Sequence, residues 1–128
     1  MKIGMEYEKK IIVSDVQTAK VMGSGDLEVF ATPSMIALME GCAAESVADS
    51  LEYGLTTVGT FIQVKHLAAT PVGMEVCCKS ILKEIDGRAL RFEIEAWDES
   101  GLIGSATHER FIVVAEKFLQ NTYKKLEK

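Results

Sequence analysis

The sequence predicts an α+β domain in which a five-stranded antiparallel sheet curls around one long central helix. Three observations carry this prediction. A single long helical segment, from Pro33 to Tyr53, is apolar over its first half and rich in small residues after it. One strand-like segment precedes this helix and four follow it. Turn signals separate the later strands, so we expect these four to form an antiparallel meander.

Length and composition indicate one ordinary globular domain. The chain has 128 residues, so we expect a single domain over residues 1–128. Apolar residues make up 48% and charged residues 26%, which excludes a disordered chain. A formal net charge of −5 argues against nucleic acid or an anionic membrane as a partner. The sequence shows neither a signal peptide nor an apolar run of about 18 residues, so we expect a cytoplasmic protein.

The three cysteines predict neither a disulfide framework nor a metal site. Cys42, Cys77 and Cys78 are odd in number, and no Cys-x-x-Cys or Cys/His spacing occurs. Cys42 lies among small residues of the helix, and we interpret it as a core residue. We therefore expect a reduced protein in which none of the three thiols is needed for activity.

The helix has clear signals at both ends. Thr32 is a good N-cap, and Pro33 suits the first helical position. Gly54 is a typical terminator after Tyr53. A helix that is apolar nearly all round is a buried helix, and a sheet must wrap it. We expect the strands at 5–13, 56–68, 74–85, 89–97 and 102–115, and a helical tail from Glu116. This arrangement is the hotdog architecture.

His66 is the first candidate for catalysis. Strict alternation places it on the strand face that should meet the helix, together with Val58, Thr60, Ile62 and Val64. It lies near the end of this strand, where an imidazole can titrate near neutral pH and transfer protons. The alternative is a hydrogen-bonded histidine of the core.

Glu40 is the second candidate, because it is the one charged residue in the stretch 35–44. If it is buried, this carboxylate needs a proton or a partner, and His66 is the only cationic candidate expected on the facing sheet. The alternative is a place on the wet side of the helix. Thr32 is the third candidate, since a capping hydroxyl can also hold a water or a thioester. Eight residues of helix, about 12 Å, separate Thr32 from Glu40, so a site that uses both is elongated or takes residues from two subunits.

Gly59 and Arg110 complete the candidate set. A glycine inside a strand marks either a bulge or a close approach, and its free N–H can stabilise an oxyanion. Arg110 shares one face of the last strand with His108, and its guanidinium suits phosphate. A surface salt bridge is the alternative for Arg110.

Three segments resemble the hotdog thioesterases related to fluoroacetyl-CoA thioesterase. They are residues 31–40 (ATPSMIALME), 56–60 (TTVGT) and 65–73 (KHLAATPVG), with support from 86–88 (DGR) and 103–111 (IGSATHERF). The resemblance covers about residues 5–115, and the Thr/Glu/His spacing is its most specific part. One segment departs: the fluoroacetyl-specific enzyme carries aromatic lid residues where this chain has residues 23–26 (GSGD). The resemblance thus implies thioesterase chemistry and not fluoroacetyl specificity.

The resemblance also implies an assembly and a set of roles. The domains would form a homodimer, or a dimer of dimers, with acyl-CoA sites at the interface. Thr32, Glu40 and His66 would be the catalytic set, the N–H of Gly59 would bind the thioester carbonyl, and Arg110 would lie near the acyl-CoA. The expected activity is acyl-CoA thioester hydrolysis, with no metal and no cofactor other than the CoA of the substrate.

Two other functions fit the same residues. One is a non-catalytic module that binds acyl-CoA, and the other is a hotdog hydratase or dehydratase, since His66 and Glu40 also suit proton abstraction. Only a thioesterase releases free CoA thiol. For the dimer we expect the strand 56–68 to be the interface edge, because an unpaired edge invites pairing with a second copy.

Overall fold

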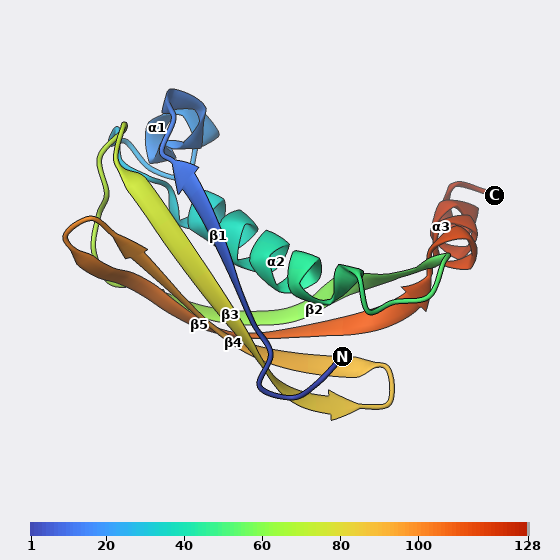
Figure 1. Cartoon of the computed structure of the whole chain (residues 1–128). Coiled ribbons are helices and arrows are strands. Elements are labelled where there is room, and N and C mark those ends of the chain that lie inside the picture. The colour runs from blue at the N-terminus through green and yellow to red at the C-terminus, as the bar shows by residue number, and fades with distance from the viewer. Residues whose placement is uncertain (128) are drawn as a thin grey trace.

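The long helix α2 (Thr32–Ala48) is the centre of the fold. In the computed structural model, which describes residues 1–127, α2 lies across the concave face of a strongly curved sheet (Figure 1). The sheet has five strands: β1 (Glu6–Ile12), β2 (Leu55–His66), β3 (Glu75–Asp86), β4 (Ala89–Asp98) and β5 (Gly101–Val114). The remaining elements are short: α1 (Ala19–Met22), α3 (Ala115–Tyr123) and 3₁₀ turns at Asp15–Gln17 and Lys124–Leu126. The predicted α+β class is confirmed, and every strand agrees with its prediction within two residues at each end.

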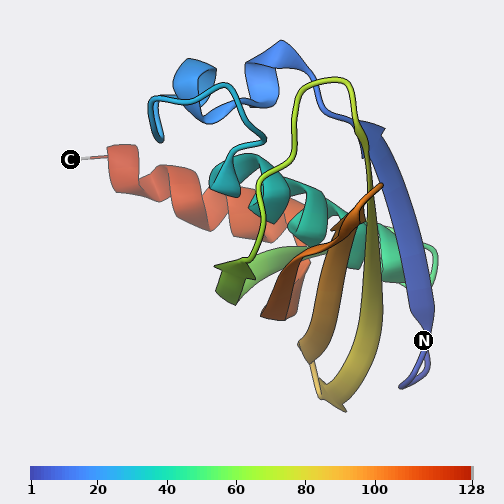
Figure 2. The same ribbon diagram turned by 90° about the vertical axis from the view of Figure 1, so that its left-hand side faces the viewer.

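The order of strands across the sheet is β1-β3-β4-β5-β2, and every pair is antiparallel. The predicted meander is wrong at its first step, because β2 pairs with β5 and not with β3. The chain leaves β2 and crosses over to β3 on the other side of the sheet (Figure 2). A turn signal marks where a strand ends but does not identify the neighbour of that strand. Strands β1 and β2 are the two edges, as expected for the segment 56–68.

One face of α2 supplies much of the core. Its buried apolar residues recur at intervals of three and four, as one face of a helix requires: Met35, Leu38, Met39, Cys42, Ala43 and Val47. They join buried side chains of β3, β4 and β5, among them Val76, Leu82, Phe92, Ile94 and Ile103. The opposite face of the helix is open in the single chain, and Ala37 and Ala48 are exposed there. The prediction of a helix buried all round is therefore wrong for one chain alone.

Thr32 does not cap the helix. Ala31 occupies the N-cap position, and its side chain makes no capping hydrogen bond. The Thr32 hydroxyl bonds to His66 of β2 instead. The expected structural role of this residue is thus wrong, and its hydroxyl is committed to a tertiary contact.

The helix also ends earlier than predicted, at Ala48 instead of Tyr53. The N–H groups of Ser50 and Leu51 bond to carbonyls three residues earlier, which tightens the chain into turns. Gly54 still reverses the chain, with a positive φ of 88°. Gly54 therefore ends a segment of turns, and the prediction that it ends the helix is wrong.

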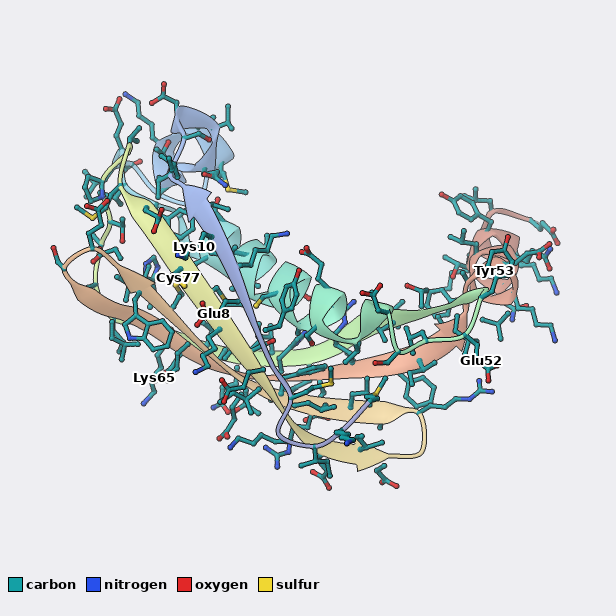
Figure 3. The ribbon with its side chains drawn as sticks, viewed as in Figure 1. Glu8, Lys10, Glu52, Tyr53, Lys65 and Cys77 are labelled. Carbon is teal, nitrogen blue, oxygen red and sulfur yellow. The ribbon has the colours of Figure 1, made fainter. Side chains whose placement is uncertain are left out.

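Strand β2 contains a bulge directly after Gly59, where its register with β5 shifts. The extra residue, Thr60, reverses the alternation of side chains, so that Gly59 and His66 both face α2. For this reason the prediction that Val58 and His66 share one face is wrong. The two alternatives considered for the strand glycine, a bulge and a close approach, both occur here. Lys65, the neighbour of His66, points away from the helix on the convex side (Figure 3).

The C-terminal helix α3 continues directly from β5, which confirms the predicted helical tail. It stands at the end of the sheet, near the loop that carries Tyr53 (Figure 3). Its side chains Phe118, Leu119 and Tyr123 are exposed. None of the helices within residues 1–127 combines the length and the apolar character needed to cross a membrane.

The packing predicts a large effect at Leu82, which is 0% exposed between the sheet and α2. Leu82→Ala should lower the free energy of unfolding by about 2–5 kcal/mol, because it leaves a cavity in a closely packed core. Leu27→Ala, at a side chain 68% exposed, is the matched control and should change it by less than about 0.5 kcal/mol. Urea denaturation measures both. Equal effects of the two substitutions would contradict this account of the core.

Candidate active site

The first cluster of candidate residues lies where α2 begins and β2 ends. Thr32 Oγ1 and His66 Nδ1 are 2.8 Å apart. His66 Nε2 is buried and has no hydrogen-bond partner within residues 1–127. Burial lowers the pKa of His66, so its imidazole is neutral at neutral pH and able to accept a proton. A cleft of about 370 Å³ opens beside the pair, and most of its other lining residues are small: Ala19, Ser24, Ala31, Ala68 and Ala69.

The second cluster lies farther along α2, around Glu40. A methyl group added at Gly59 would lie 2.7 Å from Glu40 Oε2 and 3.4 Å from Arg110 Nη1. Only a glycine therefore leaves room for the carboxylate at this point of β2. The Glu40 carboxylate, the Arg110 guanidinium and the Gly59 backbone meet on the helix-facing side of the sheet.

Arg110 is held rigidly in this second cluster. It is 8% exposed, and its Nε donates to Thr57 Oγ1 at 2.8 Å while its Nη2 donates to the Thr57 carbonyl at 2.9 Å. Burial lowers the pKa of Arg110, but a guanidinium stays charged in a protein. The surface salt bridge considered for Arg110 is thus wrong. A buried positive charge faces Glu40, which makes the cluster suited to a polarised or anionic group.

His108 completes the second cluster. Its Nε2 lies 3.2 Å from Arg110 Nη1, and its Nδ1 lies 2.8 Å from the Phe61 carbonyl oxygen. Burial lowers the pKa of His108, and the charge of Arg110 lowers it further. His108 is therefore a neutral imidazole at neutral pH.

A single chain does not bring the two clusters together. Thr32 and Glu40 are separated by eight residues of helix, about 12 Å along its axis. Within the described residues no hydrogen bond or ion pair joins Glu40 to His66. The expectation that His66 is the only cationic candidate facing Glu40 is wrong, because the charge that faces it belongs to Arg110.

Sequence reasoning missed Thr57 and the contact of His108 with Arg110. Alternation along β5 places His108 and Arg110 on one face, and the sequence predicted this. Thr57, in contrast, belongs to a different strand, β2. Its contact with Arg110 exists only because β2 pairs with β5, where Gly59 lies opposite Arg110. Sequence reasoning could have found Thr57 only by predicting that β5 is the neighbour of β2.

Cys42 and Cys78 are buried in the core, and the hydrogen bonds that Cys42 donates go to backbone carbonyls and not to the candidate residues. The Cys42 thiol donates to the Tyr7 carbonyl at 3.4 Å, and both Cys42 and Cys78 are 0% exposed in the core. The hydrogen bond with the Cys42 thiol, together with burial, raises the pKa of Cys78, which keeps its thiol protonated and unreactive. Within residues 1–127 no three His, Cys, Asp or Glu side chains converge as a metal site requires.

The fold and this constellation of residues define a hotdog-fold domain of the thioesterase class. The chain superposes on a hot-dog-like protein from Thermanaerovibrio acidaminovorans with a TM-score of 0.91 over 100% of this chain and 95% of the other, at 21% identity. It also superposes on a point variant of the fluoroacetyl-CoA-specific thioesterase FlK in complex with fluoroacetate and CoA. The TM-score there is 0.88, at 35% identity, over 92% of this chain and 99% of the other.

The sequence comparisons specify the family. Residues 13–116 match the model of the FlK family, described as fluoroacetyl-CoA-specific thioesterase, and the chain belongs to this family. The fluoroacetyl-CoA thioesterase of Streptantibioticus cattleyicolor is 44% identical over 91 residues, which are 71% of this chain and 66% of that protein. The matched part thus spans just under two thirds of that relative. The family resemblance noted in the sequence is confirmed.

Gly59 provides a direct test of the second cluster, with acyl-CoA hydrolysis as the assay. In Gly59→Ala the new methyl group would meet Glu40 Oε2 at 2.7 Å, and the flexible end of the glutamate can move away. We expect a change of less than about 1 kcal/mol in the free energy of unfolding, as is usual for exchanges within a strand. Turnover should fall by at least about tenfold, because the displaced carboxylate no longer faces Arg110.

The control is the same substitution in a Glu40→Ala background. If Gly59→Ala acts by displacing the carboxylate, it should have little further effect once that carboxylate is absent. Fully multiplicative losses of turnover in the double variant would show that Gly59 acts independently of Glu40.

Proposed function

We propose that this chain hydrolyses acyl-CoA thioesters at a site that two subunits of a homodimer complete together. One observation carries the proposal: each chain holds two separated half-sites, and in the half around Thr32 the buried His66 Nε2 has no hydrogen-bond partner among residues 1–127. A buried polar nitrogen is costly unless a hydrogen bond satisfies it. A second subunit that brings its Glu40 cluster to His66 supplies the missing group.

The edge strand β2 supports this geometry. It pairs with β5 on one side only, so its other side is free to pair with a second copy. Antiparallel pairing of two β2 strands about a twofold axis at Gln63, which is midway between Gly59 and His66 when the bulged Thr60 is left out of the count, sets His66 of one subunit opposite Gly59 of the partner subunit. The same operation generates two identical sites per dimer.

The open face of α2 supports a dimer as well. Ala37, Gly41, Ala44 and Ala48 follow one another along the side of the helix that the sheet leaves uncovered. Small side chains allow another helix to approach closely. A second copy on this face would bury the helix all round, which is what the composition of the helix predicted.

The chemistry follows from the two half-sites. The thioester carbonyl accepts a hydrogen bond from the Gly59 N–H, which stabilises the negative charge that develops on its oxygen. In the dimer the Glu40 carboxylate of the partner subunit can only accept, so it bonds to Nε2–H of His66 and leaves the lone pair on Nδ1, 2.8 Å from Thr32 Oγ1. Neutral His66 therefore takes its proton from the Thr32 hydroxyl, which either attacks the thioester itself or relays the proton of an attacking water. The carbon–sulfur bond breaks, the CoA thiolate leaves and takes a proton, and water supplies the oxygen of the free acid. Glu40 approaches His66 from the partner subunit and stabilises its protonated form.

Four variants and an acyl-CoA panel test this function. His66→Ala should lower kcat by at least about 100-fold, since it removes the group that transfers the proton. Glu40→Gln and Thr32→Ala should also be strongly impaired. The double variant of His66 and Glu40 should be little worse than the poorer single variant, because the two groups act as a unit. Release of free thiol from acyl-CoAs of increasing chain length measures all of them.

Glu45→Gln is the matched control for Glu40→Gln. Glu45 lies on the same helix, is exposed and pairs with Lys9, so its substitution should leave turnover unchanged. A folded His66→Ala protein that hydrolyses acyl-CoA at the wild-type rate would contradict the mechanism. Binding of acyl-CoA by the wild type without release of thiol would replace the hydrolase with a binding module or a hydratase.

The dimer makes a separate prediction. Light scattering at micromolar concentration should return twice the chain mass of 14.0 kDa, or a multiple of that dimer. Val64→Pro should reduce the particle to a monomer, because Leu67 donates to β5 and alternation from it points the N–H of Val64 to the free edge, where a proline cannot donate the bond to a second copy. A wild-type particle of 14.0 kDa would contradict the shared site.

A further inference from the structure

His108 makes two hydrogen bonds that are satisfied by only one form of its ring. The Phe61 carbonyl, 2.8 Å from Nδ1, can only accept, so Nδ1 carries the hydrogen. The Arg110 guanidinium, 3.2 Å from Nε2, can only donate, so Nε2 carries a lone pair. A charged imidazolium would set an N–H group against a guanidinium. The two contacts are therefore compatible only with the neutral Nδ1–H tautomer.

This arrangement excludes a role for His108 in proton transfer. The residue is 0% exposed, and both of its nitrogens are occupied by protein partners. Its ring packs near Phe92 of β4, with centroids 6.2 Å apart. Substrate has no route to either nitrogen, so any effect of His108 on the reaction acts through Arg110.

His108 holds the side of the Arg110 guanidinium that faces Glu40 and Gly59. Thr57 holds Nε and Nη2, and in the described part of the chain His108 is the only hydrogen-bond partner of Nη1. Nη1 is also the nitrogen that lies nearest to Gly59. A guanidinium held on one edge alone can rotate about that edge, which would move Nη1 away from Glu40 and Gly59.

We propose that His108 is a positioning residue, which presents Nε2 as an acceptor to Arg110 and thereby fixes the guanidinium beside Glu40 and Gly59. The kinetic part of this proposal rests on the proposed thioesterase function. The tautomer does not, because it follows from the hydrogen bonds of the folded chain.

The tautomer is measured first. The chain has two histidines, so proton–nitrogen correlation spectra of the full-length wild type and of His66→Ala assign both rings. We expect His108 at pH 7 to show a protonated Nδ1 and an unprotonated Nε2. A protonated Nε2, or protonation of both nitrogens, overturns the proposal whatever the protein hydrolyses.

The kinetic test compares two substitutions at the same position. His108→Gln retains an acceptor for Arg110, whereas His108→Leu removes it and leaves a buried charged donor without a partner. We expect kcat/KM for acyl-CoA to be at least about tenfold lower in His108→Leu than in His108→Gln. Thr57→Val, which removes the acceptor for Nε, should resemble His108→Leu.

Stability measurements separate positioning from simple packing. If His108 only fills space, the two variants lose turnover equally or in proportion to their loss of unfolding free energy, and the proposal is overturned. If the wild type releases no thiol from any acyl-CoA, the proposed function fails, and the tautomer alone then decides whether His108 holds Arg110.

Discussion

The pairing of β2 with β5, and the bulge that interrupts it after Gly59, is the constraint on which both half-sites depend. Without the extra residue, strict alternation would turn Gly59 away from α2 whenever His66 faces it. The bulge brings both residues to the helix side, where one meets Glu40 and the other meets Thr32. The same pairing sets Arg110 of β5 opposite Gly59. The Thr32–His66 pair and the cluster of Glu40 and Arg110 thus both lie along one edge strand, because of a local irregularity.

In our proposal, the geometry of the helix is the reason why one chain alone does not complete the site. Helix α2 presents Thr32 and Glu40 about 12 Å apart, while β2 runs past it in the opposite sense and offers one partner to each. The two half-sites are therefore held apart by one helix and one strand. In our proposal a twofold axis across β2 brings the Glu40 cluster of one subunit next to His66 of the other. The edge strand, the open helix face and the partnerless His66 Nε2 then have a single explanation.

Local patterns in the sequence predicted the strands, the start of the helix and the five candidate residues. Alternation, helix signals and isolated charges can each be recognised from residues that are close together in the sequence. They did not predict which strands are neighbours. The pairing of β2 with β5 depends on a crossover of the chain, which the local patterns do not show. For this reason the contacts of Arg110 with Thr57 and His108 were not predicted either. Thr32 was assigned to the helix cap, since a hydrogen bond to His66 from a distant strand leaves no local trace. The family resemblance grouped Thr32 with His66, and the two side chains do make contact, but their hydrogen bond could be seen only in the structure.

Subunit complementation tests the shared site most directly. A protein carrying Glu40→Ala and one carrying His66→Ala are each expected to be nearly inactive, and they are unfolded and refolded together as an equal mixture. Random assortment makes about half of the dimers mixed, and each mixed dimer has one site with both substitutions and one with neither. The account predicts that thioester hydrolysis recovers to about a quarter of the wild-type rate per subunit. A mixture that forms mixed dimers and stays as inactive as its two components would show that each chain builds its site alone.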